Sequence, residues 1–195
     1  MYFNEAEFRQ CSEFLTIVEM YDSHISDNKI LNELLPEKVE LASFYSGYND
    51  LFKKAFTVAC GNSFEKKLTK EIPILLSKEN LLGFNFLANQ ALDRKFHTLF
   101  KWETNNANKF FSLFGSEFKT YIGEKLRENK EYKQYEKDFL ELGNLRNIIV
   151  HEGIYNYSLG RDIESIYVLF KNSMDFIVFV CRSLCSYYNE KCMNI

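Results

Sequence analysis

The chain has 195 residues, of which 46% are hydrophobic and 26% charged, and its formal net charge is −3. This length fits one domain with a core that needs no disulfide or metal, and the charged fraction excludes a disordered chain. Two prolines and eight glycines are too few for a β-sandwich or barrel, which needs a turn roughly every 8–12 residues. The composition therefore predicts an all-α protein with an aromatic core, because 16% of the residues are Phe, Trp or Tyr.

Apolar periodicity predicts helices throughout the first half of the chain. The first helix is expected to end near residues 24–26, and a short second helix continues to Leu35. The third helix is nearly continuous through the Gly-Asn-Ser run at 61–63, with a local irregularity there. Pro73, which removes a helical hydrogen bond, and the polar run 77–80 mark the boundary that follows it.

The second half repeats this pattern. We expect a helix over about 84–100, a short helical turn at 110–114 and a helix over 116–126. Alternating charges over 127–138 indicate a solvated helical face supported by side-chain ion pairs.

The remaining residues predict two longer helices. An apolar helix over 139–151 ends at Gly153, and the clearest amphipathic helix begins near Asp162. Cys181 and Cys185 lie on the apolar stripe of the last helix, so we expect them to pack in the core and not to bind zinc. The whole chain, 1–195, is interpreted as one up-and-down helical bundle with additional short helices.

The ends and charge of the chain bear on its compartment and partners. The first five residues lack the basic segment and apolar run of a signal peptide, and the apolar stretch 176–181 is too short to span a membrane. Five cysteines without paired spacing indicate reduced thiols. We expect a cytoplasmic protein with no membrane partner. Because a dedicated DNA-binding domain is basic, any nucleic-acid contact must be local or built by two subunits.

The most informative segment places polar side chains within an apolar helical run, at Arg146, Asn147 and His151. Asn147 and His151 are four residues apart and share a helix face. Arg146 lies about 100° from Asn147 and about 140° from His151 around the helix axis, so two copies crossing at a dimer interface would combine all three. The simpler interpretation is that Arg146 and Asn147 pair locally and that His151 merely ends the helix.

These residue types suit RNA cleavage by the 2′-hydroxyl. Histidine near a helix C-terminus stays available for proton transfer near neutral pH, and the planar fork of arginine fits a phosphate. A base activates the hydroxyl, Arg146 stabilises the charged phosphorane and an acid serves the leaving 5′-oxygen. This chemistry requires no metal.

Arg146-Asn147 followed by His151, near the end of an apolar helix in a small helical chain, resembles the HEPN superfamily. The resemblance extends more loosely over 64–179, within a motif-bearing core of about 64–188. It implies a bundle that dimerises with both motifs at the interface, and in many members a metal-independent ribonuclease of toxin–antitoxin, phage-defence or RNA-processing systems. By this resemblance Arg146 and His151 would be catalytic, Asn147 would orient or bind, and no cofactor would be needed. Gly153 stands where one subgroup has a tyrosine, so the chemistry of that subgroup is not expected.

A second cluster combines Arg94, His97 and Lys101 with Trp102, beside Lys95. These side chains could bind RNA phosphates and stack a base, and His97 could supply a second acid or base if the cluster faces Arg146. The alternative is an exposed basic face with Trp102 packed against the bundle.

Two further function classes stay open: a non-catalytic HEPN-type module that binds a nucleotide or a protein, and a structural helical interaction subunit. In the ribonuclease interpretation the partners are RNA, a second copy of the chain, and a cognate antitoxin or regulator. Three other polar residues receive plainer interpretations. His24 is expected to be solvent-exposed or a cap, and Glu65 and Glu71 are expected on a solvated face.

Overall fold

The computed structural model describes residues 1–35, 41–77, 87 and 96–191. Within these residues the chain forms helices and no strand, which confirms the predicted all-α class. None of the helices in this part of the chain is long and apolar enough to cross a membrane. The helices are α1 (Glu5–Arg9), α2 (Ser12–Leu34), α3 (Leu41–Ser77), α5 (Phe96–Leu99), α6 (Asn108–Ser112), α7 (Ser116–Glu128), α8 (Lys130–Glu152) and α9 (Ile163–Lys191).

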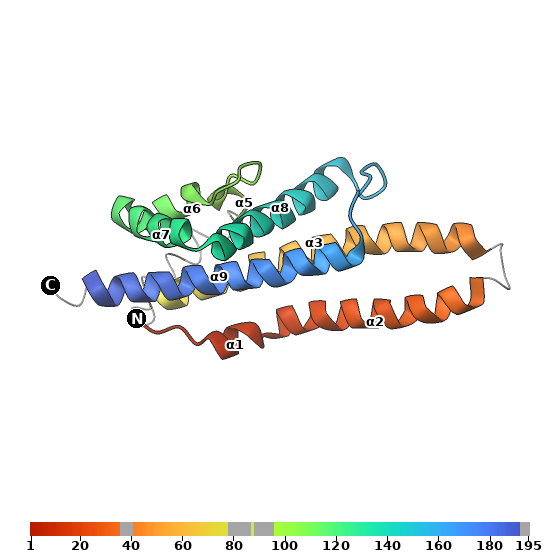
Figure 1. The fold of residues 1–195 in the computed structure, drawn as a ribbon, viewed down its shortest axis with the longest axis horizontal. Coiled ribbons are helices and arrows are strands. Elements are labelled where there is room, and N and C mark those ends of the chain that lie inside the picture. The colour runs from red at the N-terminus through yellow and green to blue at the C-terminus, as the bar shows by residue number, and fades with distance from the viewer. Residues whose placement is uncertain (36–40, 78–86, 88–95, 192–195) are drawn as a thin grey trace.

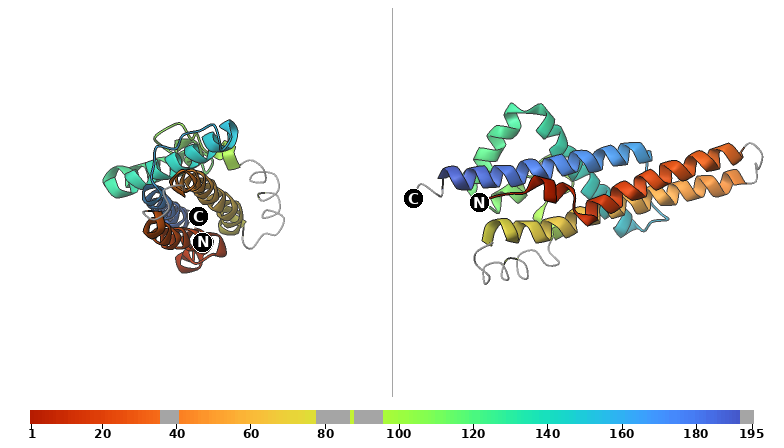
Figure 2. Two further views of the ribbon diagram at one scale, coloured as in Figure 1. Left: turned by 90° about the vertical axis from the view of Figure 1, so that its right-hand side faces the viewer. Right: turned by 90° about the horizontal axis from the view of Figure 1, so that it is seen from below.

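Helices α2, α3 and α9 run alongside one another and define the long axis of the molecule (Figure 1). Helix α3 packs against α2, α8 and α9, and α8 also packs along α9. The short helices α5, α6 and α7 lie to one side of this bundle, and the α2–α3 hairpin extends beyond the other helices. The N-terminus and the last turn of α9 lie at the opposite end (Figure 2), where the Met1 amino group donates to Asn189 Oδ1 at 3.0 Å.

The core is built from phenylalanine rings, as the composition predicts. Phe64 on α3 is 1% exposed and lies at 5.1 to 5.9 Å between ring centroids from Phe14, Phe139 and Phe170. Such tilted and edge-on pairs add to the free energy gained by burying the rings. One ring on α3 therefore joins α2, α8 and α9.

Helix α2 is longer than the sequence predicts. The expected break near 24–26 is wrong, because α2 continues to Leu34 and the His24 side chain packs flat on Phe52 of α3. Helix α3 passes through Pro73 and ends at Ser77, within the predicted boundary. Both residues are buried, so tertiary packing outweighs the local breaking signal. Most of the helix expected over 84–100 lies outside the described residues.

The charged stretch 127–138 is not one solvated helical face. Asn129 accepts hydrogen bonds from two backbone N–H groups and begins α8, so two helices meet where one was expected. Glu136 is fully buried, and its Oε1 accepts from the backbone N–H of Ala107 at 2.7 Å. Asp138 is also buried and accepts from Asn172 on α9 at 2.6 Å. These carboxylates connect α8 to the segment before α6 and to α9. A pattern of charges in the sequence does not show which carboxylates are buried in such contacts.

The end of α8 agrees with the sequence. Gly153 has φ +87, a backbone conformation that favours glycine, and α9 begins where the Asp162 carboxylate accepts from Ser165 N at 2.7 Å. Helix α8 therefore presents Arg146, Asn147 and His151 in its last two turns, beside α3.

Candidate functional site

Arg146 reaches across α3 because α3 carries a glycine at the crossing. A Cβ atom added to Gly61 would lie 2.7 Å from Arg146 Cγ and 2.9 Å from its Cβ, which is closer than real Cβ contacts. The missing side chain lets the stem of Arg146 lie against the backbone of α3. The guanidinium group therefore emerges beside the next turn of α3, near Asn62 and Glu65.

Four of the five N–H groups of Arg146 are donated to oxygen acceptors within the chain, and the fifth faces His97. Nε and Nη2 donate to Asn62 Oδ1 at 2.9 and 2.8 Å, and Nη2 also donates to Glu65 Oε2 at 3.3 Å. Nη1 donates to Asn147 Oδ1 at 3.2 Å and lies 3.2 Å from His97 Nε2. We call these five residues the Arg146 cluster; they come from α3, α5 and α8.

His97 stands between two opposite charges. Its Nε2 lies 3.4 Å from Glu65 Oε2 as well as close to Arg146. Burial lowers the pKa of His97, the charges of Arg146 and His151 lower it further, and the charge of Glu65 opposes them. The imidazole is therefore neutral at pH 7 and has a lone pair available to accept a proton.

The three residues of the predicted motif occupy different environments. Arg146 has a side chain only 15% exposed, and Asn147 is half-buried and bonded to it. His151 is exposed in the last turn of α8, where its charge still reaches His97. The structure thus brings together Arg146, Asn147 and His97, and leaves His151 at the edge of the cluster, facing solvent.

The second predicted cluster is divided. Trp102 is 7% exposed, and its Nε1 donates to the His97 carbonyl oxygen at 3.0 Å. Its ring lies 2.0 Å from where a Cβ on Gly143 would be, so the alternative in which Trp102 packs against the bundle describes the structure, and no ring face remains for a base. Lys101 is exposed, while Arg94 and Lys95 lie outside the described residues.

The floor of the Arg146 cluster is closed. The cavity beneath it, lined by rings that include Phe64, Phe96 and Trp102, measures about 10 Å³, too small for a ligand. A substrate must therefore meet the cluster from the solvent side. Within the described part of the chain, no three His, Cys, Asp or Glu side chains are grouped to hold a metal ion.

Sequence reasoning missed two members of the cluster. Asn62 was expected at a kink and Glu65 on a solvated face, but both bind Arg146, which lies more than 80 residues away in the chain. The available signal was their spacing of three residues, which places them on one helix face directly after Gly61. Glu71 is also not solvated, because it pairs with Lys67 at 3.0 Å and both side chains are mostly buried.

No protein-family model matches this chain, and neither a curated protein sequence nor a solved structure matches it. The resemblance to HEPN proteins therefore rests on the motif residues and on their place in a small helical chain. What the site can do must be argued from the geometry of the Arg146 cluster.

Proposed function

We propose that the chain is a metal-independent endoribonuclease of the HEPN type that acts as a homodimer. The observation that supports this most strongly is the contact between Arg146 and His97, which places a phosphate-binding group beside a neutral imidazole. Cleavage of RNA by its own 2′-hydroxyl needs this pair, a positive charge for the phosphorane and a base for the hydroxyl.

In the proposed reaction, His97 Nε2 takes the proton of the 2′-hydroxyl as the oxygen attacks phosphorus. The bond from phosphorus to the 5′-oxygen breaks, and His151 gives a proton to the leaving oxygen. Arg146 Nη1, on the side of the guanidinium nearest His97, stabilises the charge on the phosphoryl oxygens, while Asn62 and Glu65 hold the other side. The products are a 2′,3′-cyclic phosphate and a 5′-hydroxyl.

The dimer is part of the proposal because the Arg146 and His151 side chains of one chain point in different directions. His151 lies five residues beyond Arg146, about 140° around the helix, and is exposed where Arg146 is mostly covered. A second copy against this end of α8 would bring its own His151 toward the first copy's Arg146. RNA would then bind at a site shared by two subunits, which suits a chain with a net charge of −3.

The deciding experiment is incubation of the purified protein with labelled RNA in EDTA, with the product ends mapped. We expect cyclic phosphate ends from the wild type and at least a 100-fold slower reaction from Arg146→Ala, His97→Ala and His151→Ala. Arg127→Ala, on the exposed face of α7, is the matched control and should cleave normally. If the Arg146 and His151 variants cleave like the wild type, the proposal is wrong.

Mixing inactive subunits tests the shared site. If Arg146 and His151 of one site come from different chains, a heterodimer of Arg146→Ala and His151→Ala subunits keeps one intact site and regains up to half of the wild-type activity. If both residues of a site belong to one chain, the mixture stays inactive. Size-exclusion chromatography with light scattering establishes that the mixed sample is dimeric.

The proposed role as a toxin or phage-defence effector follows from the proposed ribonuclease activity and the resemblance to HEPN proteins. Expression of the wild type in a bacterial host should arrest growth, whereas His151→Ala should not. Rescue by a co-expressed neighbouring gene product would identify the cognate antitoxin.

A second candidate function has an observation in its favour. Because Arg146 already donates hydrogen bonds to Asn62, Glu65 and Asn147 within one chain and contacts His97, the cluster can serve as a purely structural connection between α3, α5 and α8 in a non-catalytic binding module. This alternative predicts thermal stabilisation by a nucleotide or protein partner without RNA cleavage. It also predicts that Arg146→Ala lowers the free energy of unfolding without affecting any reaction.

A further inference from the structure

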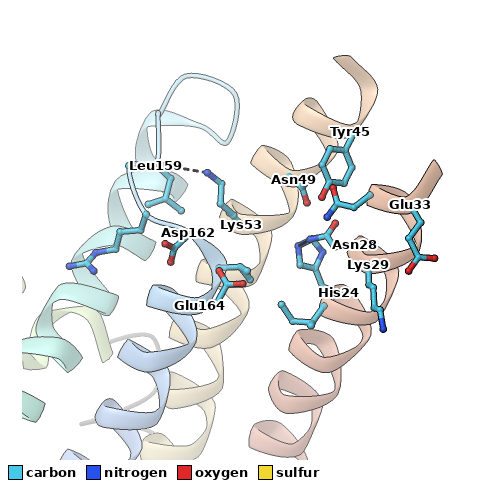
Figure 3. Close-up of a pocket in the computed structure, with 15 residues that line it drawn as sticks. His24, Asn28, Lys29, Glu33, Tyr45, Asn49, Lys53, Leu159, Asp162 and Glu164 are labelled. Atoms are coloured by element: carbon cyan, nitrogen blue, oxygen red, sulfur yellow. Dashed lines mark hydrogen bonds between the residues drawn. The ribbon is translucent and has the colours of Figure 1, made fainter. Parts of the chain in front are cut away.

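A groove lies between α2, α3 and the loop before α9 (Figure 3). Its volume is about 990 Å³, at the upper end of the range for pockets that bind small molecules. Its lining includes His24 and Asn28 from α2, and Tyr45 and Asn49 from α3. The residues that line it include no member of the Arg146 cluster.

Three of the residues that line this groove each have a buried polar atom with no hydrogen-bond partner within the described chain: His24 Nδ1, Asn28 Oδ1 and Asn49 Oδ1. His24 is only 2% exposed, which corrects the expectation that it is a solvent-exposed or capping residue. Figure 3 shows His24 and Asn28 pointing from α2 toward α3, and Asn49 pointing from α3 toward them. Because an unpaired buried polar group destabilises the folded chain, such a set indicates a site for a molecule that supplies the missing partners.

The hydrogen-bonding roles of these atoms follow from their neighbours. Asn28 Nδ2 lies 2.8 Å from His24 Nε2, and since an amide nitrogen only donates, Nε2 accepts. Burial lowers the pKa of His24, so the ring is neutral at pH 7 and its proton is on Nδ1. The ring stacks on Phe52 with centroids 3.8 Å apart and an interplanar angle of 4°, which fixes the direction of Nδ1. The groove therefore presents one donor, Nδ1–H, and two carbonyl acceptors.

The charges of the groove balance. Two of its cations are already held, because Lys53 Nζ donates to the Leu159 carbonyl oxygen at 3.4 Å and Arg161 Nε to Glu141 at 2.7 Å. The groove thus favours neither an anion nor a cation, and an uncharged ligand fits it best. The cationic lining residues are Lys29, Lys53 and Arg161, and the anionic ones are Glu33, Asp162 and Glu164.

We propose that this groove binds a nucleobase by an edge on which an amino group stands beside a ring nitrogen, as in adenine and cytosine. The two amino hydrogens would be donated to Asn28 Oδ1 and Asn49 Oδ1, and the ring nitrogen would accept from His24 Nδ1–H. Hypoxanthine and uracil have a carbonyl oxygen and an N–H at these positions, so they leave the groove's donor and acceptors mismatched. Tyr45 provides an aromatic wall for the base. A bridging water is the competing occupant of the same three atoms.

Matched nucleosides test the proposal without altering the protein. Adenosine, inosine, cytidine and uridine are titrated into the full chain by calorimetry. We expect saturable binding of adenosine and cytidine, each at least 10-fold tighter than its deaminated counterpart. Equal affinities within a pair, or no saturation by any of the four, would overturn the proposal and leave water as the occupant.

A variant pair locates the binding in the groove. Asn49→Leu removes one acceptor and should weaken adenosine at least 10-fold, while the unliganded protein keeps or raises its Tm because an unpaired carbonyl has been removed. Asn105→Leu, in the exposed turn before α6, is the control and should bind adenosine like the wild type. Wild-type affinity in Asn49→Leu would show that the nucleoside binds elsewhere and would refute the assignment.

Titration with short RNA distinguishes a base within an RNA strand from a free nucleoside as the ligand of the groove. This experiment alone rests on the proposed ribonuclease function. Oligoadenylate and oligoinosinate are titrated into Arg146→Ala, which should not cleave them. Tighter binding of oligoadenylate than of adenosine, reduced by Asn49→Leu, assigns the groove to a base of the bound strand. Binding of adenosine without oligoadenylate assigns it to a free nucleoside, and that outcome stands even if the chain cleaves no RNA.

Discussion

The stem of Arg146 occupies the position that a side chain at Gly61 would fill, with Arg146 Cγ 2.7 Å from where that Cβ would be. A second such contact lies on α8, where the Trp102 ring occupies the position of a side chain at Gly143. Both glycines lie in helices that would be more stable with alanine. Each glycine therefore lowers the stability of its helix but leaves space for a large side chain, Arg146 at Gly61 and Trp102 at Gly143.

Gly61→Ala is expected to displace Arg146 and so to reduce RNA cleavage. The nearest atoms are Cβ and Cγ of Arg146, which cannot move aside without shifting α8, and a shift of about 1 Å can cost about 100-fold in rate. We expect kcat/KM to fall about 100-fold in a folded protein. Gly47→Ala, on the same helix with nothing within 4 Å of the added Cβ, should leave the activity unchanged and raise stability by about 0.5–1 kcal/mol.

Gly143→Ala is expected to destabilise the fold itself. The added Cβ would lie 2.0 Å from the Trp102 ring, inside a packed aromatic core, so the free energy of unfolding should fall by about 3 kcal/mol. Gly123→Ala on α7, where nothing lies within 4 Å, should stabilise the protein slightly. Urea denaturation of the two variants measures the difference, and equal midpoints would contradict the described packing of Trp102.

Glu65→Gln is expected to shift the pH dependence of cleavage. The Glu65 charge raises the pKa of His97 against the larger lowering effects of burial and Arg146. Its removal should lower that pKa further, so the acid limb of the kcat/KM profile moves to lower pH. Glu124→Gln, an exposed carboxylate on α7, is the control. An acid limb that stays in place would mean that His97 is not the base.

Stability should decline in two separate ranges as the pH falls. Burial lowers the pKa of His24 and is the largest effect lowering that of His97, so below about pH 6.5 the unfolded chain binds more protons than the native one and stability decreases. Glu13 has its pKa lowered to about 2, chiefly by its hydrogen bond with Lys70. Its contribution is complete above about pH 4.5 and is lost as the pH falls toward 2.

Chemical denaturation at pH 8, 6, 4 and 3 tests both ranges. Glu13→Gln should cost about 1–2 kcal/mol at pH 7 and flatten only the lower range, because Lys70 is largely exposed and the pair is partly screened. His97→Gln should reduce the pH dependence of stability only in the upper range, below about pH 6.5. If neither variant changes the slope, the assigned groups are not the ones that titrate.

Local features were predictable from the sequence and long-range contacts were not. The glycine that ends α8 is where the sequence predicts it, since Gly153 has φ +87. The burial of His24 and the binding of Arg146 by Asn62 and Glu65 depend on which helices become neighbours. A helical period gives the face of each residue, but not the partner that the face meets.

Helix α3 carries residues of both proposed sites, Asn49 in the groove and Asn62 in the Arg146 cluster, on one uninterrupted run from Leu41 to Ser77. At 1.5 Å per residue, thirteen residues separate them by about 20 Å along the axis. Because both residues lie on one continuous helix, α3 sets the distance between the two sites. Insertion of one residue in α3 between the sites would turn one site about 100° relative to the other.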